Sequence, residues 1–278
     1  MKELIPDSSQ RTILRRSGKQ KKPKQINDLL GPGIGKRELV GAIGLEPTTP
    51  TMSRWCSNQL SYAPEKPMTI HQDEPIALAY ADDDLLVVEK PHGLPAVPGR
   101  PQHLRDCLAS RVQARWPDAR VVHRLDMATS GLMLFARHAR SQRQLSAAFA
   151  ERRVAKEYLA LVTGRPSARA GTIDLPLSAD WPRRPRQRVD LDHGRPSVTH
   201  WACEPAEEGA NCTRVRLVPE SGRTHQLRVH LAALGHAIVG DELYGGPPAP
   251  RLMLHATALS FDHPAQALRL CFRSPAPF

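Results

Sequence analysis

Short apolar runs and regularly spaced apolar positions alternate along most of the chain, and together they predict its elements. Runs bounded by turn formers predict strands over 76–80, 85–90, 121–125, 154–162, 197–204, 213–218, 252–260 and 268–272, with another in the apolar run after Gly131. The remaining pattern predicts helices over 104–116, 138–151 and 224–234. Strands outnumber helices, and the two kinds do not alternate strictly. The sequence therefore predicts an α+β fold with a largely antiparallel sheet.

The pattern changes near residue 70, which indicates a domain boundary. Residues 1–70 carry 12 Lys and Arg against 6 Asp and Glu, whereas residues 71–278 carry 27 against 22. The first segment lacks sustained periodicity, so we expect a disordered basic extension. Part of it resembles accidental translation across a tRNA gene, which would make Met68 the native start. Residues 71–278 are expected to form the folded domain.

The overall charge favours a polyanionic partner. The formal net charge is +11 and the sequence pI is about 9.9. Nucleic acid is the first candidate, and an anionic membrane surface is the second. The apolar runs are far shorter than the ~18 residues of a membrane span, and the N-terminus has no apolar signal region. The five cysteines are scattered without a C-x-x-C pair. We expect a cytoplasmic protein with reduced thiols.

Metal and hydrolase chemistry are both disfavoured. Four possible zinc ligands lie close together in sequence: His193, His200, Cys203 and Cys212. Their spacings match no zinc ribbon or finger, so we interpret them as surface histidines and core thiols. The acidic trio at 82–84 is interpreted as a solvated turn and not as a cation site. Ser130 lies in T-S-G and not in the G-x-S-x-G turn of hydrolases.

Asp126 occupies an unusual position, between a strand-like segment and a turn of small residues at 128–131. Rigid backbone at the rim of a sheet would hold its carboxylate, and catalytic groups are often placed there. An isolated Asp in such a turn more often caps the turn through its own side chain. The neighbouring motifs decide between these two interpretations.

The segment around Asp126, HRLDMATSGL, resembles the signature of the RluA family of RNA pseudouridine synthases. Four further blocks are similar to family blocks and follow the family order: EKPHGLPAVPGR (89–100), KEYLALV (156–162), GRTHQLRVHLAALGHAIVGDELYG (222–245) and LMLHATALSF (252–261). The resemblance covers roughly residues 75–278. It implies the pseudouridine-synthase fold, in which helices flank a mixed, largely antiparallel central sheet and a catalytic cleft crosses it.

The resemblance also implies catalytic roles for motif residues. Asp126 is the expected nucleophile or charge stabiliser, in an isomerisation that requires no metal or cofactor. Tyr158 is expected to pack against the flipped uracil, and Arg223 to pair with the catalytic Asp. Arg124 should share one face of an extended strand with Asp126 and fill the space that the flipped base leaves.

Other motif residues are expected to contact or support the substrate. Leu227 should line the base pocket, and Lys156 and Lys90 should position backbone or contact phosphate. For His123, a structural hydrogen bond explains its presence as well as any chemical role. The small residues at 128–131 are expected to allow close approach of the RNA.

The block DLPLSADWPRRPRQRV (174–189) is similar to one subgroup of the family. That subgroup modifies a tRNA anticodon stem-loop and a 23S rRNA hairpin, at tRNA position 32 and rRNA position 746. The block at 174–189 of this chain contains four arginines near Trp181. They predict an RNA-facing loop, because like charges repel one another without an anionic partner. They are Arg183, Arg184, Arg186 and Arg188.

The expected partner is thus RNA, with no DNA or membrane partner, and the protein is expected to act as a monomer. Two alternatives stay open. One is the same chemistry on another rRNA or tRNA uridine, and the other is a non-catalytic RNA-binding protein with this fold.

Overall fold

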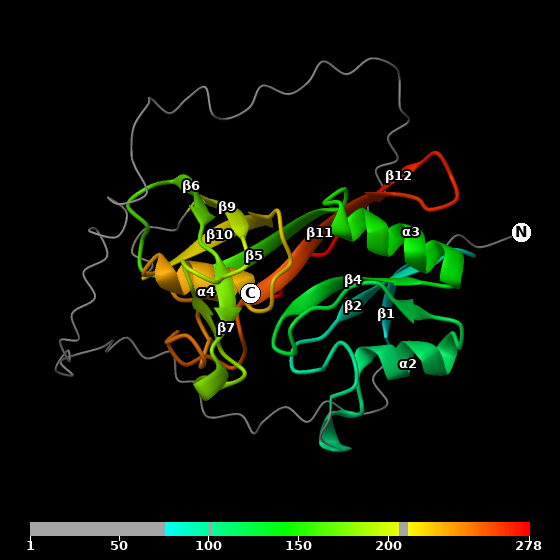
Figure 1. Cartoon of the computed structure of the whole chain (residues 1–278), viewed down its shortest axis with the longest axis horizontal. Coiled ribbons are helices and arrows are strands. Elements are labelled where there is room, and N and C mark those ends of the chain that lie inside the picture. Colours follow the sequence, from blue (N-terminus) through cyan, green and yellow to red (C-terminus); the bar gives the residue numbers. More distant parts are fainter. Residues whose placement is uncertain (1–75, 100–101, 206–210) are drawn as a thin grey trace, which may run out of the picture. The chain divides into compact units, whose positions relative to one another are not determined.

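A 10-stranded sheet dominates the part of the chain that the structure, a computed structural model, describes: residues 76–99, 102–205 and 211–278 (Figure 1). The expectations for residues 1–70 lie outside the described residues. The strand order is β1-β2-β4-β11-β5-β10-β9-β6, with β3 paired to β4 and β12 paired to β11. Strands β7 and β8 form a separate two-stranded sheet.

The strands are β1 (Ala77–Ala81), β2 (Leu85–Lys90), β3 (Arg120–Val121), β4 (Ser130–Ala136), β5 (Ala155–Thr163), β6 (Ala170–Asp174), β7 (Leu177–Ala179), β8 (Gln187–Val189), β9 (Val198–Cys203), β10 (Cys212–Pro219), β11 (Leu254–Asp262) and β12 (Arg269–Arg273). Among these described strands, only β4 and β11 pair in parallel. The prediction of an α+β fold with a largely antiparallel sheet is confirmed.

Three α-helices and two short 3₁₀ helices accompany the sheet in the described residues: α2 (Leu108–Arg115), α3 (Ala139–Ala150), α4 (Gln226–Ala233), η2 (Gln102–Leu104) and η3 (Trp181–Arg183). Helix α2 starts later than the expected 104 because Cys107 caps it. The Cys107 sulfur accepts from the backbone N–H of Ser110 at 3.4 Å, and the Ser110 hydroxyl accepts from the Cys107 N–H at 3.1 Å. None of the described helices has the length and apolarity that a membrane crossing requires.

The expected strand at 121–125 is wrong in its extent, because β3 ends at Val121. The chain leaves the sheet there and carries the HRLD segment to one face of it. Strands β6, β7 and β8 were not expected. Apart from Ile173 and Leu177 their residues are half-buried or exposed, and short strands of that kind show little apolar periodicity.

Both faces of the sheet near β4 are covered, which explains the unbroken apolar run after Gly131. All seven residues of β4 are buried. Leu132 and Leu134 pack towards Leu145 of α3, whereas Met133 and Phe135 pack towards Val112 of α2. Strand β4 therefore forms a rigid base for the loop that precedes it.

Helix α4 covers a neighbouring part of the sheet and forms a third core cluster. Its Leu227 and Leu231 pack with Ala160 and Val162 of β5. Because side chains alternate along a strand, Tyr158 lies on the same face of β5 as these two residues. The start of α4 and the start of β5 thus meet over one face of the sheet.

Candidate active site

A cavity of about 460 Å³ opens where the HRLD segment, β5 and α4 meet. Its volume lies within the ~300–1,000 Å³ that is typical of small-molecule sites. The end of α3 and the loop that follows β10 complete its walls. All seven site residues proposed from the sequence line it: His123, Arg124, Asp126, Lys156, Tyr158, Arg223 and Leu227.

A buried lysine, Lys90, holds the loop that carries Asp126. Lys90 is 1% exposed, and its ammonium group donates to the carbonyls of Pro91, Leu94 and Met127 at 2.7, 2.7 and 2.9 Å. Burial lowers the pKa of Lys90 to about 7, although the charge of Asp126 opposes this. Three carbonyls match the three N–H donors of an ammonium group. Of the two roles expected for Lys90, these contacts favour backbone positioning.

His123 has a structural role that its position at the end of β3 explains. Its Nε2 accepts a hydrogen bond of 2.9 Å from the backbone N–H of Leu134, in the middle of β4. That amide lies just beyond the short β3–β4 ladder, so the ring replaces the missing strand partner. The ring also stacks on Phe149, with centroids 4.5 Å apart. Burial, followed by the charge of Lys156, lowers the pKa of His123 to about 3.

This lowered pKa predicts a specific loss of stability in acid. Between pH 6.5 and about 3 the unfolded chain binds a proton at His123 and the folded chain does not. The free energy of unfolding therefore falls with falling pH, by up to about 1.4 kcal/mol per unit from this group. We expect His123→Gln, which keeps an acceptor but does not titrate, to make the pH dependence shallower in urea denaturation. Exposed His193→Gln is the matched control, and equal slopes for His123→Gln and the native protein would contradict the prediction.

The pairing of Arg223 with Asp126 is wrong, because Arg228 occupies that place. The Arg228 Nη1 lies 3.9 Å from Oδ2 of Asp126, whose side chain is 27% exposed. Arg223 is exposed in the loop before α4, and its Nε donates to the Pro196 carbonyl at 3.5 Å. Arg228 sits within the first turn of α4 and is directed at the carboxylate. Arg223 still lines the cavity.

Asp241 holds Arg228 in this position through two hydrogen bonds. Nε and Nη2 of Arg228 each donate to an Asp241 oxygen at 2.7 Å, and both residues are buried. This bidentate geometry fixes the plane of the guanidinium group and leaves Nη1 towards Asp126. Burial by itself would lower the pKa of Arg228, but Asp241 and then Asp126 raise it on balance. Arg228 is therefore a fixed positive charge beside the candidate nucleophile.

Tyr158 and Leu227 form the apolar side of the cavity. Tyr158 lies on β5 between Leu217 of β10 and Ala256 of β11. Burial and the negative charge of Asp126 both raise the pKa of Tyr158, so its hydroxyl stays protonated at neutral pH. Leu227 is 7% exposed and belongs to the core under α4. Together they offer apolar surface a short way from the carboxylate.

Arg124 and Lys156 supply positive charge at the edge of the cavity. Arg124 is exposed, and its Nη2 donates to the Thr224 hydroxyl at 3.4 Å. It does not lie on an extended strand as expected, because the regular strand ends at Val121. Lys156 is half-buried, and burial and then the charge of Arg152 lower its pKa.

The sequence analysis missed His225 and Tyr244, which connect the cavity to α4. His225 adopts the left-handed conformation with a φ of 53°, which is rare and strained for a residue other than glycine. Its Nδ1 is 2.8 Å from the Tyr244 hydroxyl, and the centre of the Tyr244 ring lies 5.1 Å from the Arg228 guanidinium carbon. Both residues stand inside quoted motifs, but no local pattern shows that they meet.

Two of the small residues at 128–131, Ser130 and Gly131, have packing roles, and close approach of RNA to this turn stays a prediction. A side chain at Gly131 would collide with the backbone of Ala256 at 2.4–2.9 Å, and its φ of +112° also favours glycine. Ser130 is buried, and its hydroxyl is 2.7 Å from Nδ1 of His255. These residues therefore allow β4 and β11 to pair closely beneath the Asp126 loop.

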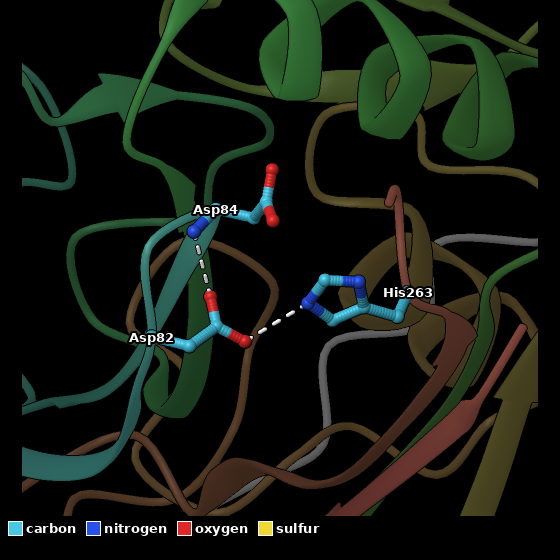
Figure 2. A group of neighbouring side chains, drawn as sticks. All are labelled: Asp82, Asp84 and His263. Atoms are coloured by element: carbon cyan, nitrogen blue, oxygen red, sulfur yellow. Dashed lines mark hydrogen bonds and ion pairs between the residues drawn. The ribbon is translucent and has the colours of Figure 1, made fainter. Parts of the chain in front are cut away.

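Asp82, Asp84 and His263 bring their side chains close together, but hydrogen bonds account for the arrangement (Figure 2). Asp82 accepts from the Asp84 backbone N–H at 2.8 Å and from His263 at 2.9 Å. Asp84 accepts from the hydroxyl of Ser141, at the start of α3, at 2.7 Å. The acidic trio is a turn, as expected, but Asp82 and Asp84 are half-buried and tie three segments together.

The four zinc candidates do not come together as one site in the described residues. His200 contacts the Thr172 hydroxyl at 2.9 Å and Glu220 at 2.8 Å. Cys203 and Cys212 lie on neighbouring strands, β9 and β10. Within the described ranges these residues and His193 do not meet as one ligand group.

Comparisons with known proteins agree with the motif resemblance. A family model described as RNA pseudouridylate synthase matches residues 84–233. The dual-specificity RNA pseudouridine synthase RluA of Escherichia coli (strain K12) is 46% identical over 212 residues, which cover 74% of this chain and 96% of that protein. The RluA of Vibrio vulnificus (strain CMCP6) is 50% identical over 195 residues, covering 67% and 78%. The solved structure of human RNA pseudouridylate synthase domain containing 1 has a TM-score of 0.62 at 31% identity, covering 74% and 85%.

Proposed function

The chain belongs to the RNA pseudouridylate synthase family and is an RNA pseudouridine synthase, and we propose that Asp126 is the catalytic carboxylate by which it isomerises one uridine of a small RNA stem-loop. The observation that carries this role is the position of Asp126. Its carboxylate is partly exposed at a cavity, 3.9 Å from the fixed Arg228, on a loop held by Lys90. A carboxylate held this way is preorganised for reaction with a base brought into the cavity.

The reaction rearranges bonds without changing composition. The N1–C1′ bond of uridine breaks, the uracil turns, and a C5–C1′ bond forms. The C5 proton leaves and N1 gains a proton, so no electrons, energy donor or further group enter the balance. In this reaction Asp126 supplies the nucleophile or negative charge beside C1′ and C6, and Arg228 orients the carboxylate.

The target uridine must leave the RNA stack to reach Asp126. Arg124 is exposed at the rim, and a planar guanidinium can stack on bases and contact phosphate. In the proposed complex Arg124 fills the space that the uracil leaves. Tyr158 and Leu227 then hold the detached uracil between them and prevent its loss while it turns. Lys156 and Arg223 contact the backbone of the same loop.

We propose a tRNA anticodon stem-loop and a 23S rRNA hairpin as the substrates. The support is that the relatives from Escherichia coli and Vibrio vulnificus are described as dual-specificity enzymes. The net charge of +11 also favours a polyanionic substrate. Residues 71–278 would form the catalytic domain, acting as a cytoplasmic monomer. The alternative is the same chemistry on another rRNA or tRNA uridine.

Pseudouridine mapping of tRNA and rRNA from a deletion strain tests the proposal. We expect specific uridines to stay unmodified in the deletion strain and to regain modification when the native gene is restored. Restoration with Asp126→Asn should leave them unmodified. A mapping profile that does not change on deletion would contradict the proposed function, and rescue by Asp126→Asn would remove Asp126 from the mechanism.

A further inference from the structure

Strands β7 and β8 and the η3 turn between them form an arm outside the main sheet (Figure 1). The base of the arm is anchored, because the N–H of Leu177 donates to the Arg195 carbonyl at 3.0 Å and the reverse bond is 2.8 Å. Ser178 also donates its hydroxyl to Asp190 at 2.8 Å. None of the arm residues 177–189 lines the cavity of about 460 Å³. The arm therefore contributes no wall to the catalytic cavity.

The tip of the arm has a defined conformation. Asp180 is 4% exposed, and one of its carboxylate oxygens lies 2.8 Å from Nε of Arg183. The backbone N–H of Asp180 donates to the Arg186 carbonyl, and that of Arg186 donates to the Arg183 carbonyl, each at 3.0 Å. A ligand that binds the tip would order few further groups, which lowers the entropic cost of binding.

This rigid tip presents an aromatic ring to solvent. Trp181 is 67% exposed, and the Arg184 guanidinium carbon lies 3.4 Å from the centre of its ring. A single exposed apolar side chain is common on protein surfaces, so the distinguishing feature is the guanidinium group that lies over this ring. Stacked Arg and Trp side chains offer flat surfaces of the size of a nucleobase, and such surfaces bind unpaired bases with little regard to sequence.

The charge of the arm selects the class of partner. Arg183 pairs with Asp180 and Arg188 with Asp190, just beyond the arm, whereas the guanidinium group of Arg184 lies over the Trp181 ring. Nε of Arg186 is buried without a hydrogen-bond partner among the described residues. An excess of arginine around an exposed Trp favours a polyanion with aromatic bases over an apolar protein surface.

The arm stands beside the catalytic cavity, so both can contact one RNA. The backbone N–H of Gln187 on β8 donates to the Tyr244 hydroxyl at 2.8 Å, and that hydroxyl is 2.8 Å from Nδ1 of His225. The centre of the Tyr244 ring lies 5.5 Å from the guanidinium carbon of Arg186 and 5.1 Å from that of Arg228. A loop whose uridine enters the cavity would thus have neighbouring nucleotides within reach of the arm.

We propose that Trp181 and Arg184 form a stacking platform for an unpaired base of the same RNA loop that presents the target uridine. The proposal rests on the proposed function for the identity of the RNA. It assigns the arm to substrate selection, because a platform of this kind engages an unpaired loop base and not a continuous duplex.

The test compares Trp181→Ala, Trp181→Phe and Arg184→Ala with the native protein, in the full chain. Binding is measured with a uridine-containing RNA hairpin and with a fully paired RNA duplex of the same stem. We expect Trp181→Ala to weaken hairpin binding about 5- to 150-fold, as the loss of one stacked base predicts. Duplex binding and kcat at saturating hairpin should hardly change, so KM carries the effect. Trp181→Phe should restore most of the affinity, because it keeps a ring.

Arg115→Ala is the matched control for Arg184→Ala. Arg115 also lies over a tryptophan, at 4.6 Å from the Trp116 ring centre, but it belongs to α2 and not to the arm or the cavity. The Arg115→Ala variant should bind the hairpin as the native protein does, whereas Arg184→Ala should bind it more weakly. A 2-aminopurine placed in the loop reports stacking directly, and we expect its fluorescence to be quenched by the native protein and less by Trp181→Ala.

Three results would overturn the platform. Unchanged hairpin affinity in Trp181→Ala would leave the tip for a protein partner, and equal losses for hairpin and duplex would indicate a general loss of charge or fold. Failure of Trp181→Phe to restore binding would exclude ring stacking. The proposed function fails separately, if the native protein forms no pseudouridine in any RNA, and the hairpin and duplex measurements do not depend on that outcome.

Discussion

Replacing Asp126 with asparagine is expected to lower kcat for pseudouridine formation by at least about 10³-fold. The substitution keeps the size of the side chain but removes the negative charge that we assign to the reaction at C1′ and C6. Release of tritium from RNA that carries 5-tritiated uridine measures the reaction, because the C5 hydrogen leaves when the new carbon–carbon bond forms. RNA affinity should stay within a few fold, since Asp126 opposes and does not attract phosphates.

The control for this variant is Asp118→Asn, at an exposed position outside the cavity. It changes the net charge by the same amount, and its kcat should match that of the native protein. Asp126→Ala guards against slow reversion of asparagine to aspartate. Undiminished turnover in both Asp126 variants would remove Asp126 from the mechanism of this pseudouridine synthase.

Replacing Arg228 with alanine is expected to cause the second large effect, on stability and activity together. Asp241 is 1% exposed and would lose the cation that both its oxygens contact. Breaking a buried pair in this way typically costs about 3–5 kcal/mol of the free energy of unfolding. Asp126 would lose its nearby positive charge at the same time, so kcat should fall by roughly 10²-fold or more. Urea denaturation and tritium release measure the two effects.

Two further variants separate the charge effect from the loss of fold. Arg228→Lys keeps a positive charge but cannot reproduce the bidentate contact with Asp241, so we expect partial recovery of stability and little recovery of kcat. Arg223→Ala tests the residue that the motif suggested. It should leave stability within about 0.5 kcal/mol, as for an exposed residue, and affect KM more than kcat. A larger fall in kcat for Arg223→Ala than for Arg228→Lys would reverse our assignment.

The arrangement around Arg228 joins distant parts of the chain by specific contacts. Asp241 fixes its guanidinium plane, and Tyr244 contacts both this group and the His225 that begins α4. His225 has a strained φ of 53°, and its side chain contacts the Tyr244 hydroxyl. The geometry of the candidate active site therefore depends on residues that do not face the substrate.

Local pattern was sufficient for the long elements and insufficient for the short ones. Strand β4 and helix α3 bury apolar residues with a clear run or spacing, so their existence follows from the need to remove those residues from water. Strand β3 has two residues and ends where the His123 ring takes over its hydrogen bonding. A side chain that substitutes for a strand leaves no periodic signal, which is why the strand at 121–125 was predicted too long.

The sequence by itself determined the fold class, because the spacing of apolar residues predicts the elements. Its motifs determined the family, and the resemblance to that family indicated the residues that would share one cavity. Only the tertiary structure decided which arginine meets Asp126. Arg223 and Arg228 stand in one motif, and their difference arises from the start of α4 and from Asp241 beyond it. Similarly, the structure shows that Lys90 supports the Asp126 loop through its hydrogen bond to Met127. It also shows that Gly131 allows close packing against Ala256. The type of a side chain determines which chemistry it can perform. The packing of segments far apart in sequence determines which partner it meets.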